Sequence, residues 1–231
     1  AEAYKNETDA SVCAELAKNL RALNTLLGDE PFHADFQRMA RGIFQPIVGR
    51  IGWDARPGEG HLDALLRSTA IDQLGGYEAD NTLGEASSRF ALYVDDRSNV
   101  HRDVRGVVVA LAAKRGDRTT YDTMWDLQRK ASLPEEQVRF LMALGRFEQP
   151  DLLQETLQRS LSTDVRVHET ISVLASVAGN RHGRDMAWGF IKDNWDELYR
   201  RYGEGGFGLM RLVSLTSSFT TLEKREDVQR F

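Results

Sequence analysis

The sequence has one cysteine, Cys13, among its 231 residues. An intramolecular disulfide is therefore impossible, which fits a reducing compartment or a piece of a larger chain. Long apolar runs are also missing, and none approaches the roughly 18–20 residues that cross a bilayer as a helix. We expect neither a disulfide-stapled scaffold nor a membrane partner.

An excess of positive charge is absent as well. The chain has 30 Lys and Arg against 35 Asp and Glu, a formal net charge of −5. Proteins that bind nucleic acid through its phosphates usually carry a strongly basic face, so we expect no nucleic-acid partner. The 41% apolar and 28% charged residues are ordinary for a globular domain with a core.

Patterns that carry chemistry are scarce. His168-Glu169 has the first half of a zinc-protease helix motif, but Ser172 stands where the second histidine is needed. We interpret His168 as a polar residue on a helix surface. Cys13 lies on a helical apolar stripe and is interpreted as a core residue, not a nucleophile. The sequence predicts no catalytic residue and no metal ligand in this chain.

Apolar residues recur at helical spacing through most of the chain, and strand signals are almost absent. The clearest stripe lies in residues 183–202, where the apolar positions are three or four residues apart: Trp188, Ile191, Trp195, Leu198 and Tyr202. Asp196 and Glu197 stand four residues before Arg200 and Arg201, a spacing that supports helices. We predict one core helix over 183–202, with an inter-helix turn from Gly203 to Gly208.

The same spacing predicts further helices, separated by glycine, proline and capping signals. Thr82–Glu85 and Ser132–Glu135 read as capping boxes, and Pro46 is expected to close or kink the helix that contains it. An irregular loop with three glycines and a proline covers residues 51–60. The expected helices cover 11–27, 32–47, 61–74, 82–93, 103–115, 120–131, 132–144, 150–161, 164–179 and 209–215, and a last one begins near Thr220.

The helices show a weak repeat. Asp-Val-Arg occurs at 103–105 and again at 164–166, with two helical hairpins between the two copies. Helix pairs that repeat every ~30–45 residues are typical of an α-solenoid, in which each pair buries its stripe against its neighbours. We predict an all-α fold of antiparallel helix pairs, stacked like HEAT or armadillo repeats into a curved superhelix. A single helical-repeat domain is expected over residues 1–231.

Arg105 and Arg166 occupy equivalent places in the two copies, and two interpretations stay open. Each arginine pairs locally with the aspartate two residues before it, which we favour. Alternatively, the two arginines lie on one face of the superhelix and bind a peptide carboxylate. In the 51–60 loop we interpret Trp53 and Glu59 as a structural clasp in preference to a binding feature.

Two blocks of sequence resemble a known family. Residues 51–67 contain Ile-Gly-Trp-Asp, then Pro-Gly-Glu-Gly-His-Leu-Asp-Ala-Leu-Leu-Arg, and residues 190–199 read Phe-Ile-Lys-Asp-Asn-Trp-Asp-Glu-Leu-Tyr after His182-Gly183-Arg184. Both blocks resemble the C-terminal domain of the M1-family zinc aminopeptidases, in particular the puromycin-sensitive type. The resemblance extends in order over essentially the whole chain.

This resemblance implies a HEAT-like helical bowl that packs over a catalytic domain in the same polypeptide and encloses the cavity for peptide substrates. It also implies a cytoplasmic location. The family's zinc-binding His-Glu-x-x-His, its distal glutamate and its Gly-Ala-Met-Glu-Asn motif belong to an upstream domain and do not occur here. We therefore expect zinc only in the parent's catalytic domain and no cofactor in this chain.

One other class of function stays open, a stand-alone helical-repeat adaptor that binds another protein in its groove. The chain begins at Ala1 without a methionine and ends at Phe231 on a half-finished pattern. We interpret it as a fragment of a larger protein, which weighs against the adaptor. An independent hydrolase has no candidate triad or dyad in the sequence.

Overall fold

The computed structural model describes residue 4 and residues 7–204 and 207–231. These residues form helices and contain no strand, which confirms the predicted all-α fold class. The α-helices are α1 (Ala10–Leu26), α2 (His33–Ile51), α3 (His61–Gly76), α4 (Asp80–Asp95), α5 (Arg105–Arg115), α6 (Arg118–Lys130), α7 (Pro134–Leu144), α8 (Pro150–Ser160), α9 (Val167–Ala178), α10 (Arg184–Asp193), α11 (Trp195–Tyr202), α12 (Phe207–Ser214) and α13 (Leu222–Arg230), with short 3₁₀ turns η2 (Arg97–Asn99) and η3 (Leu215–Ser218).

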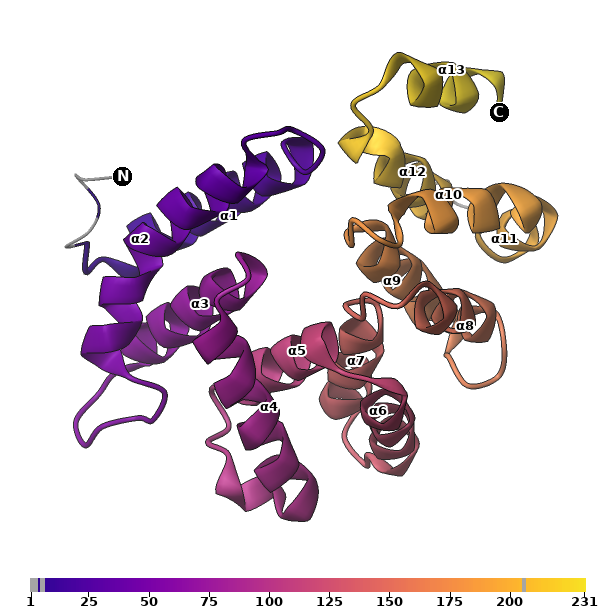
Figure 1. Ribbon diagram of the computed structural model, residues 1–231. Coiled ribbons are helices and arrows are strands. Elements are labelled where there is room, and N and C mark those ends of the chain that lie inside the picture. The colour runs from indigo at the N-terminus through magenta and orange to yellow at the C-terminus, as the bar shows by residue number, and fades with distance from the viewer. Residues whose placement is uncertain (1–3, 5–6, 205–206) are drawn as a thin grey trace. The chain divides into compact units, whose positions relative to one another are not determined.

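The chain divides into two compact units, unit 1 from Ala1 to Arg115 and unit 2 from Gly116 to Phe231. Each unit is a stack of helix pairs in two layers (Figure 1). The single domain expected over residues 1–231, and the curvature expected for it, stay predictions.

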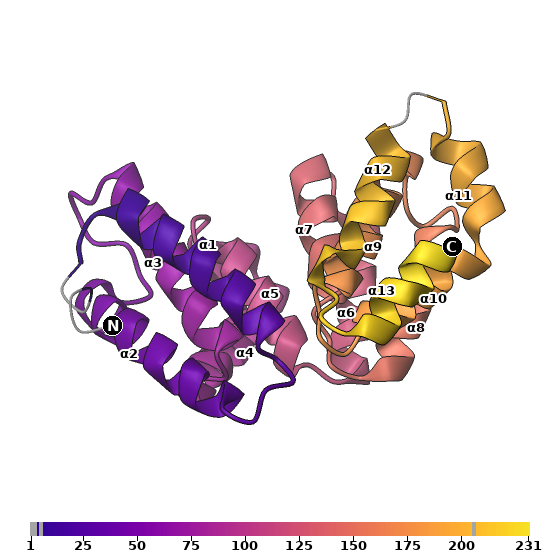
Figure 2. The same ribbon diagram turned by 90° about the horizontal axis from the view of Figure 1, so that it is seen from above.

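Unit 1 places α1, α3 and α5 side by side in one layer, with α2 packed on α3 and α4 packed on α5 in the other (Figures 1 and 2). Burial follows from the helical spacing, because each helix turns its apolar stripe toward the facing layer. The fully buried side chains between the layers include Phe44, Ile47, Ile71, Leu74, Tyr77, Tyr93 and Leu111.

A close approach between α3 and α5 depends on glycine. A Cβ placed on Gly75 would lie 2.6 Å from a methyl carbon of Leu111, which is fully buried. At the next position, Gly76, a Cβ would meet no atom within 4 Å. The backbone of α3 therefore touches the side-chain layer of α5 at Gly75 only because that residue has no side chain.

The loop between α2 and α3 is fastened by one buried cation. Arg67 of α3 has only 1% of its surface exposed. Its Nε donates to the Gly52 carbonyl at 3.1 Å, its Nη2 donates to the Ile51 carbonyl at 3.3 Å, and it forms an ion pair with Glu59. Gly52 has a φ of 67°, a value that favours glycine. The contacts of Glu59 match the predicted structural clasp.

The same loop is also held by α4. Arg89 forms a bidentate ion pair with Asp54, at 2.6 and 2.9 Å, and its guanidinium lies 5.2 Å from the centre of the Trp53 ring. Hydrogen bonding from Arg89 holds the pKa of Asp54 below its usual value. Trp53 is thus packed as part of the clasp.

Unit 2 repeats the arrangement, with α7, α9 and α12 in one layer and α6, α8, α10 and α11 in the other (Figure 2). Its C-terminal part is built on a continuous apolar cluster. The buried members of this cluster are Leu153, Leu157, Ile171, Leu174, Val177, Ala178, Ala187, Trp188, Ile191, Leu198 and Leu212.

The single helix predicted over residues 183–202 is wrong, because the chain breaks at Asn194 between α10 and α11. Asn194 has φ −114° and ψ 20°, and its side-chain Nδ2 donates to the Phe190 carbonyl at 2.8 Å. An asparagine side chain that binds a nearby carbonyl competes with the helical backbone pattern. The predicted stripe nevertheless faces the core, with Trp188, Ile191 and Leu198 buried. Of the predicted turn, residues 205 and 206 lie outside the described residues, and Gly208 is already in α12.

Both predicted capping boxes are wrong. The helix expected at Thr82 begins earlier, at Asp80, and its N-cap, Ala79, makes no side-chain cap. The helix expected at Ser132 begins with Pro134, whose missing N–H and fixed φ suit the first helical position. Pro46 does not end its helix, because α2 continues to Ile51 and buries the apolar residues beyond the proline. The last helix is capped by Thr221, near the predicted start.

We expect Gly75→Ala and Gly76→Ala to change stability in opposite directions. The first substitution forces Leu111 to move in a filled core, which costs about 1–3 kcal/mol. The second removes backbone freedom from the unfolded chain without a clash and stabilises by about 0.4–1 kcal/mol. Urea denaturation of both variants measures the two values, and equal effects at the two positions would show that α3 and α5 do not meet at Gly75.

Arg67→Leu is expected to lower the free energy of unfolding by about 2–4 kcal/mol, because Glu59 and two loop carbonyls lose their buried donor. Arg38 provides the control: it also pairs with a carboxylate, Asp35, but both side chains are about 70% exposed. Arg38→Leu should change stability by less than about 0.5 kcal/mol. A loss at Arg67 no larger than at Arg38 would contradict the clasp.

Candidate functional site

Arg105 is the first residue of α5 and is used to fasten the preceding turn. Its Nε donates to the Val100 carbonyl at 2.9 Å and its Nη2 to the Arg97 carbonyl at 2.8 Å. The guanidinium lies 5.9 Å from the centre of the Tyr93 ring. The aspartate expected as its partner, Asp103, lies instead against His101 and Arg102. The local partner predicted for Arg105 is therefore wrong.

Arg166 is the residue before α9 and pairs one helical turn ahead, with Glu169. The predicted partner, Asp164, lies 3.6 Å from Arg159 instead. Glu169 is buried, and its carboxylate raises the pKa of Arg166 above the usual value. Arg166 itself remains 42% exposed. The predicted local ion pair of Arg166 is therefore confirmed, but its partner is Glu169 and not Asp164.

The two arginines lie in different units, Arg105 in unit 1 and Arg166 in unit 2. Arg105 donates two hydrogen bonds to carbonyls of the preceding turn, whereas the side chain of Arg166 is 42% exposed. The contact of either arginine with a peptide stays a prediction.

The structure adds a groove that the sequence analysis did not identify. It lies on α1 where that helix packs against α3, and its volume is about 490 Å³. Its lining combines small residues with two cations three residues apart, Lys18 and Arg21. The lining residues are Ala14, Ala17, Lys18, Arg21, Ala22, Thr25 and Thr69.

The groove presents two cations, a kind of group that binds carboxylates. Lys18 forms an ion pair with Glu15 at 3.6 Å, and both side chains are largely exposed, so this pair is weak in water. Arg21 forms an ion pair with Asp72, which fixes its position above the groove. Concave surfaces with a few placed polar groups are the usual binding sites of folded proteins. The only sequence signal was the alternation of alanines and cations on α1.

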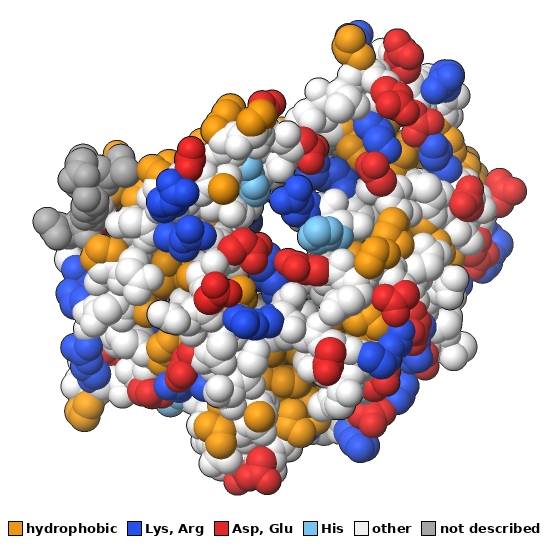
Figure 3. Space-filling view, viewed as in Figure 1, with side chains coloured by type: hydrophobic (Ala, Val, Ile, Leu, Met, Phe, Trp, Pro, Cys, Tyr) orange, Lys and Arg blue, Asp and Glu red, His pale blue; other side chains and the backbone are white. Residues whose placement is uncertain are grey.

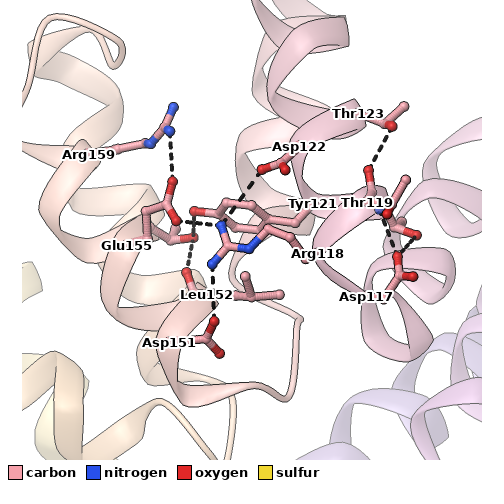
Figure 4. Close-up of polar contacts among 12 residues, drawn as sticks. Asp117, Arg118, Thr119, Tyr121, Asp122, Thr123, Asp151, Leu152, Glu155 and Arg159 are labelled. Carbon is pink, nitrogen blue, oxygen red and sulfur yellow. Dashed lines mark hydrogen bonds and ion pairs between the residues drawn. The ribbon is translucent and has the colours of Figure 1, made fainter.

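Unit 2 contains a second group of charges, centred on Arg118 of α6 (Figure 4). Its guanidinium lies 2.6 Å from Glu155, 3.1 Å from Asp151 and 3.7 Å from Asp122. Burial raises the pKa of Glu155, but Arg118 and Arg159 more than offset this effect, so the pKa lies below its usual value. These acids are neutralised by arginines in a network that joins α6 to α8, so we interpret it as structural.

No cluster that could hold a metal ion occurs among the described residues. His168 is exposed while Glu169 is buried against Arg166, so the half motif forms no ligand pair. Cys13 is buried in the core, and burial raises the pKa of its thiol, as suits a packing residue. Acidic and basic side chains are interspersed over the face shown in Figure 3.

Residues 1–231 match, over their full length, the family described as the ERAP1-like C-terminal domain. The chain belongs to this family. The resemblance to the C-terminal domain of M1 aminopeptidases is thereby confirmed. In the described part of this ERAP1-like domain, no helix is long and apolar enough to span a membrane.

Curated relatives of the domain are named as aminopeptidases. It is 32% identical over 237 residues to Aminopeptidase M1-A of Oryza sativa subsp. japonica, with 99% of this chain and 26% of the relative covered. Aminopeptidase M1 of Arabidopsis thaliana is 30% identical, with 99% and 27% covered. Aminopeptidase 2 of Candida albicans is 24% identical, with 99% and 25% covered. The chain thus spans about a quarter of the length of these relatives.

In this ERAP1-like domain we expect Arg166→Ala to destabilise unit 2 by about 1–3 kcal/mol, because it leaves the buried Glu169 without a partner. Adding Glu169→Gln should recover part of the loss, since a neutral amide costs less to bury unpaired. A double-mutant cycle from chemical denaturation measures this coupling. Asp164→Asn combined with Arg166→Ala is the control and should show no coupling; equal coupling at both acids would restore Asp164 as the partner.

Proposed function

We propose that this chain is the C-terminal helical domain of an M1 zinc aminopeptidase, packs on the catalytic domain of the same polypeptide and encloses its peptide cavity. One observation carries the proposal: the chain matches an ERAP1-like C-terminal domain over its full length, while relatives named as aminopeptidases are about four times as long. Zinc, in the catalytic domain, would activate the water that cleaves the N-terminal peptide bond.

The residues of this chain act on the substrate without touching the reacting bond. A helical wall around the cavity excludes bulk water and limits the entry of folded chains. The groove on α1, with Lys18 and Arg21, offers the carboxylate at the far end of a peptide a cationic contact. Arg105 and Arg166 are further candidates for this contact, and Arg166 is favoured by its exposure.

Two finer statements belong to the same proposal. We infer that the parent is of the puromycin-sensitive type and acts in the cytoplasm. Both inferences are supported by the resemblance of residues 51–67 and 182–199, and both predict an enzyme that works on free peptides.

The test uses the full-length polypeptide, its Lys18→Gln variant and the 231-residue chain alone. Each is assayed with a short aminoacyl reporter and with peptides of increasing length. The full-length protein should cleave both kinds of substrate and lose activity to a zinc chelator, whereas the 231-residue chain should show no turnover. Lys18→Gln should raise KM for long peptides by up to about fivefold, the effect of one exposed charge pair worth up to ~1 kcal/mol, and leave the reporter unchanged.

Arg38→Gln is the matched control, because Arg38 is an exposed cation on α2, in the other layer of unit 1. It should leave KM unchanged for every substrate. A full-length protein without aminopeptidase activity would refute the proposed enzyme. An equal effect of Lys18→Gln on reporter and long peptides would remove the groove from the substrate path.

A further inference from the structure

The helix α13 is attached to unit 2 with very little burial. None of its residues from Leu222 to Arg230 is buried, whereas each of the other described α-helices buries at least one side chain. Most of its side chains are charged or polar, and a helix of nine residues is marginal on its own in water. A small set of contacts with neighbouring helices therefore keeps α13 in place.

These contacts join two helix faces of the same spacing. α13 lies along α10, and on each helix the contacting side chains are three and four residues apart, so that they share one side (Figure 2). Cations of one helix meet acids of the other, as in the pair of Lys224 with Asp185 at 2.9 Å. The residues concerned are Lys224, Asp227 and Phe231, which follows the end of α13, and on α10 Asp185, Trp188 and Lys192.

Asp227 is the centre of the attachment. One of its carboxylate oxygens accepts a hydrogen bond from Trp188 Nε1 at 2.8 Å, and Lys192 Nζ lies 2.8 and 2.7 Å from the two oxygens. Hydrogen bonds from Lys192 and Trp188 hold the pKa of Asp227 below its usual value, so the carboxylate is charged at neutral pH. The side chains of Asp227 and Lys192 are 30% and 31% exposed, so water reaches this ion pair and weakens it.

Phe231 covers two indoles. Its ring centre lies 5.1 Å from that of Trp188 and 5.0 Å from that of Trp195, and both ring pairs are edge-on. Phe231 is itself 47% exposed, whereas Trp188 is only 4% exposed. Departure of α13 would remove the acceptor of the Trp188 N–H and the ring that packs against both indoles.

The apolar cluster of unit 2 is complete without α13. All of its buried members lie in helices α8 to α12, and Val228 of α13 packs against it while only partly buried. Segments with few buried apolar contacts open at a lower free energy than the helices of a core. The contacts of α13 thus allow it to leave while the helices beneath it stay packed.

We propose that α13 is a strap that opens and closes over the indoles of Trp188 and Trp195 as a separate unit, with Asp227 as its latch. In the closed state both indoles are shielded by Phe231. In the open state the domain presents an aromatic surface with the Lys192 ammonium beside it. This opening takes place within unit 2 and goes beyond the proposed function, since it does not require an active enzyme.

The experiment combines amide hydrogen exchange with hydroxyl-radical footprinting, both read by mass spectrometry, on the full-length polypeptide and two variants. Asp227→Asn removes the ion pair with Lys192 and keeps the shape of the side chain. Glu226→Gln is the matched control, because Glu226 is the preceding residue on the same helix and is an exposed acid. Trp125 of α6, with 1% exposed, serves as the buried reference for indole oxidation.

In the unmodified polypeptide, the amides of α13 should have protection factors lower than those of α9 by about tenfold or more. Asp227→Asn should lower the protection of α13 a further two- to fivefold or so, roughly the effect of one partly exposed ion pair. It should also raise the oxidation of Trp188 and Trp195 while α9 and Trp125 stay unchanged. Glu226→Gln should change none of these values.

Three results would overturn the proposal. Equal protection of α13 and α9 would show that α13 opens only together with the whole unit. Equal effects of the two substitutions would remove Asp227 as the latch. Faster exchange of α13 in Asp227→Asn without more oxidation of Trp188 would show a helix that frays without uncovering the indoles.

Discussion

Burial of one apolar stripe per helix, against the helices nearest in sequence, is the constraint on which the rest of the structure depends. No helix of such a stack can hide its stripe alone, so each is stable only while its neighbours are in place. The consequence is visible at Gly75, where α3 comes so close to Leu111 of α5 that a methyl group would not fit. It is visible again in unit 2, where residues from α8 to α12 share one apolar cluster.

Polar contacts refine this arrangement without replacing it. Arg67 fastens a loop, Arg105 fastens a turn and Arg118 joins α6 to α8, and all three work mainly within their own unit. Such arginines orient segments that the apolar stripes leave free. Lys18 and Arg166 differ because much of each side chain faces solvent, which makes them the better candidates for a contact with substrate.

Helical periodicity predicted most of the helices, because the spacing of Leu, Ile and aromatic residues reports directly which side is buried. It missed the break at Asn194, since Trp188, Ile191, Trp195 and Leu198 keep helical spacing across it. The capping boxes failed because Ser and Thr followed by Glu also occur where an earlier Asp or a proline starts the helix.

The candidate site was harder to predict than the fold. The sequence favoured Asp164 as the partner of Arg166, but in three dimensions Arg166 pairs with Glu169, one helical turn ahead. The groove on α1 gave almost no signal, because alanines mark a depression only when the neighbouring helix is in place. Whole-chain similarity therefore identifies the family, while the contacts of individual side chains require coordinates.

The clasp of the 51–60 loop shows that the family resemblance in residues 51–67 includes residues with a structural role. Residues 51–67 include Gly52, Glu59 and Arg67, and in the folded chain Arg67 binds both of the others. One structural contact therefore depends on three residues that are separated in the sequence: a glycine that adopts a left-handed backbone conformation, an acid and an arginine. A sequence pattern of this kind indicates how two helices are connected. It carries no information about the reaction that a protein catalyses.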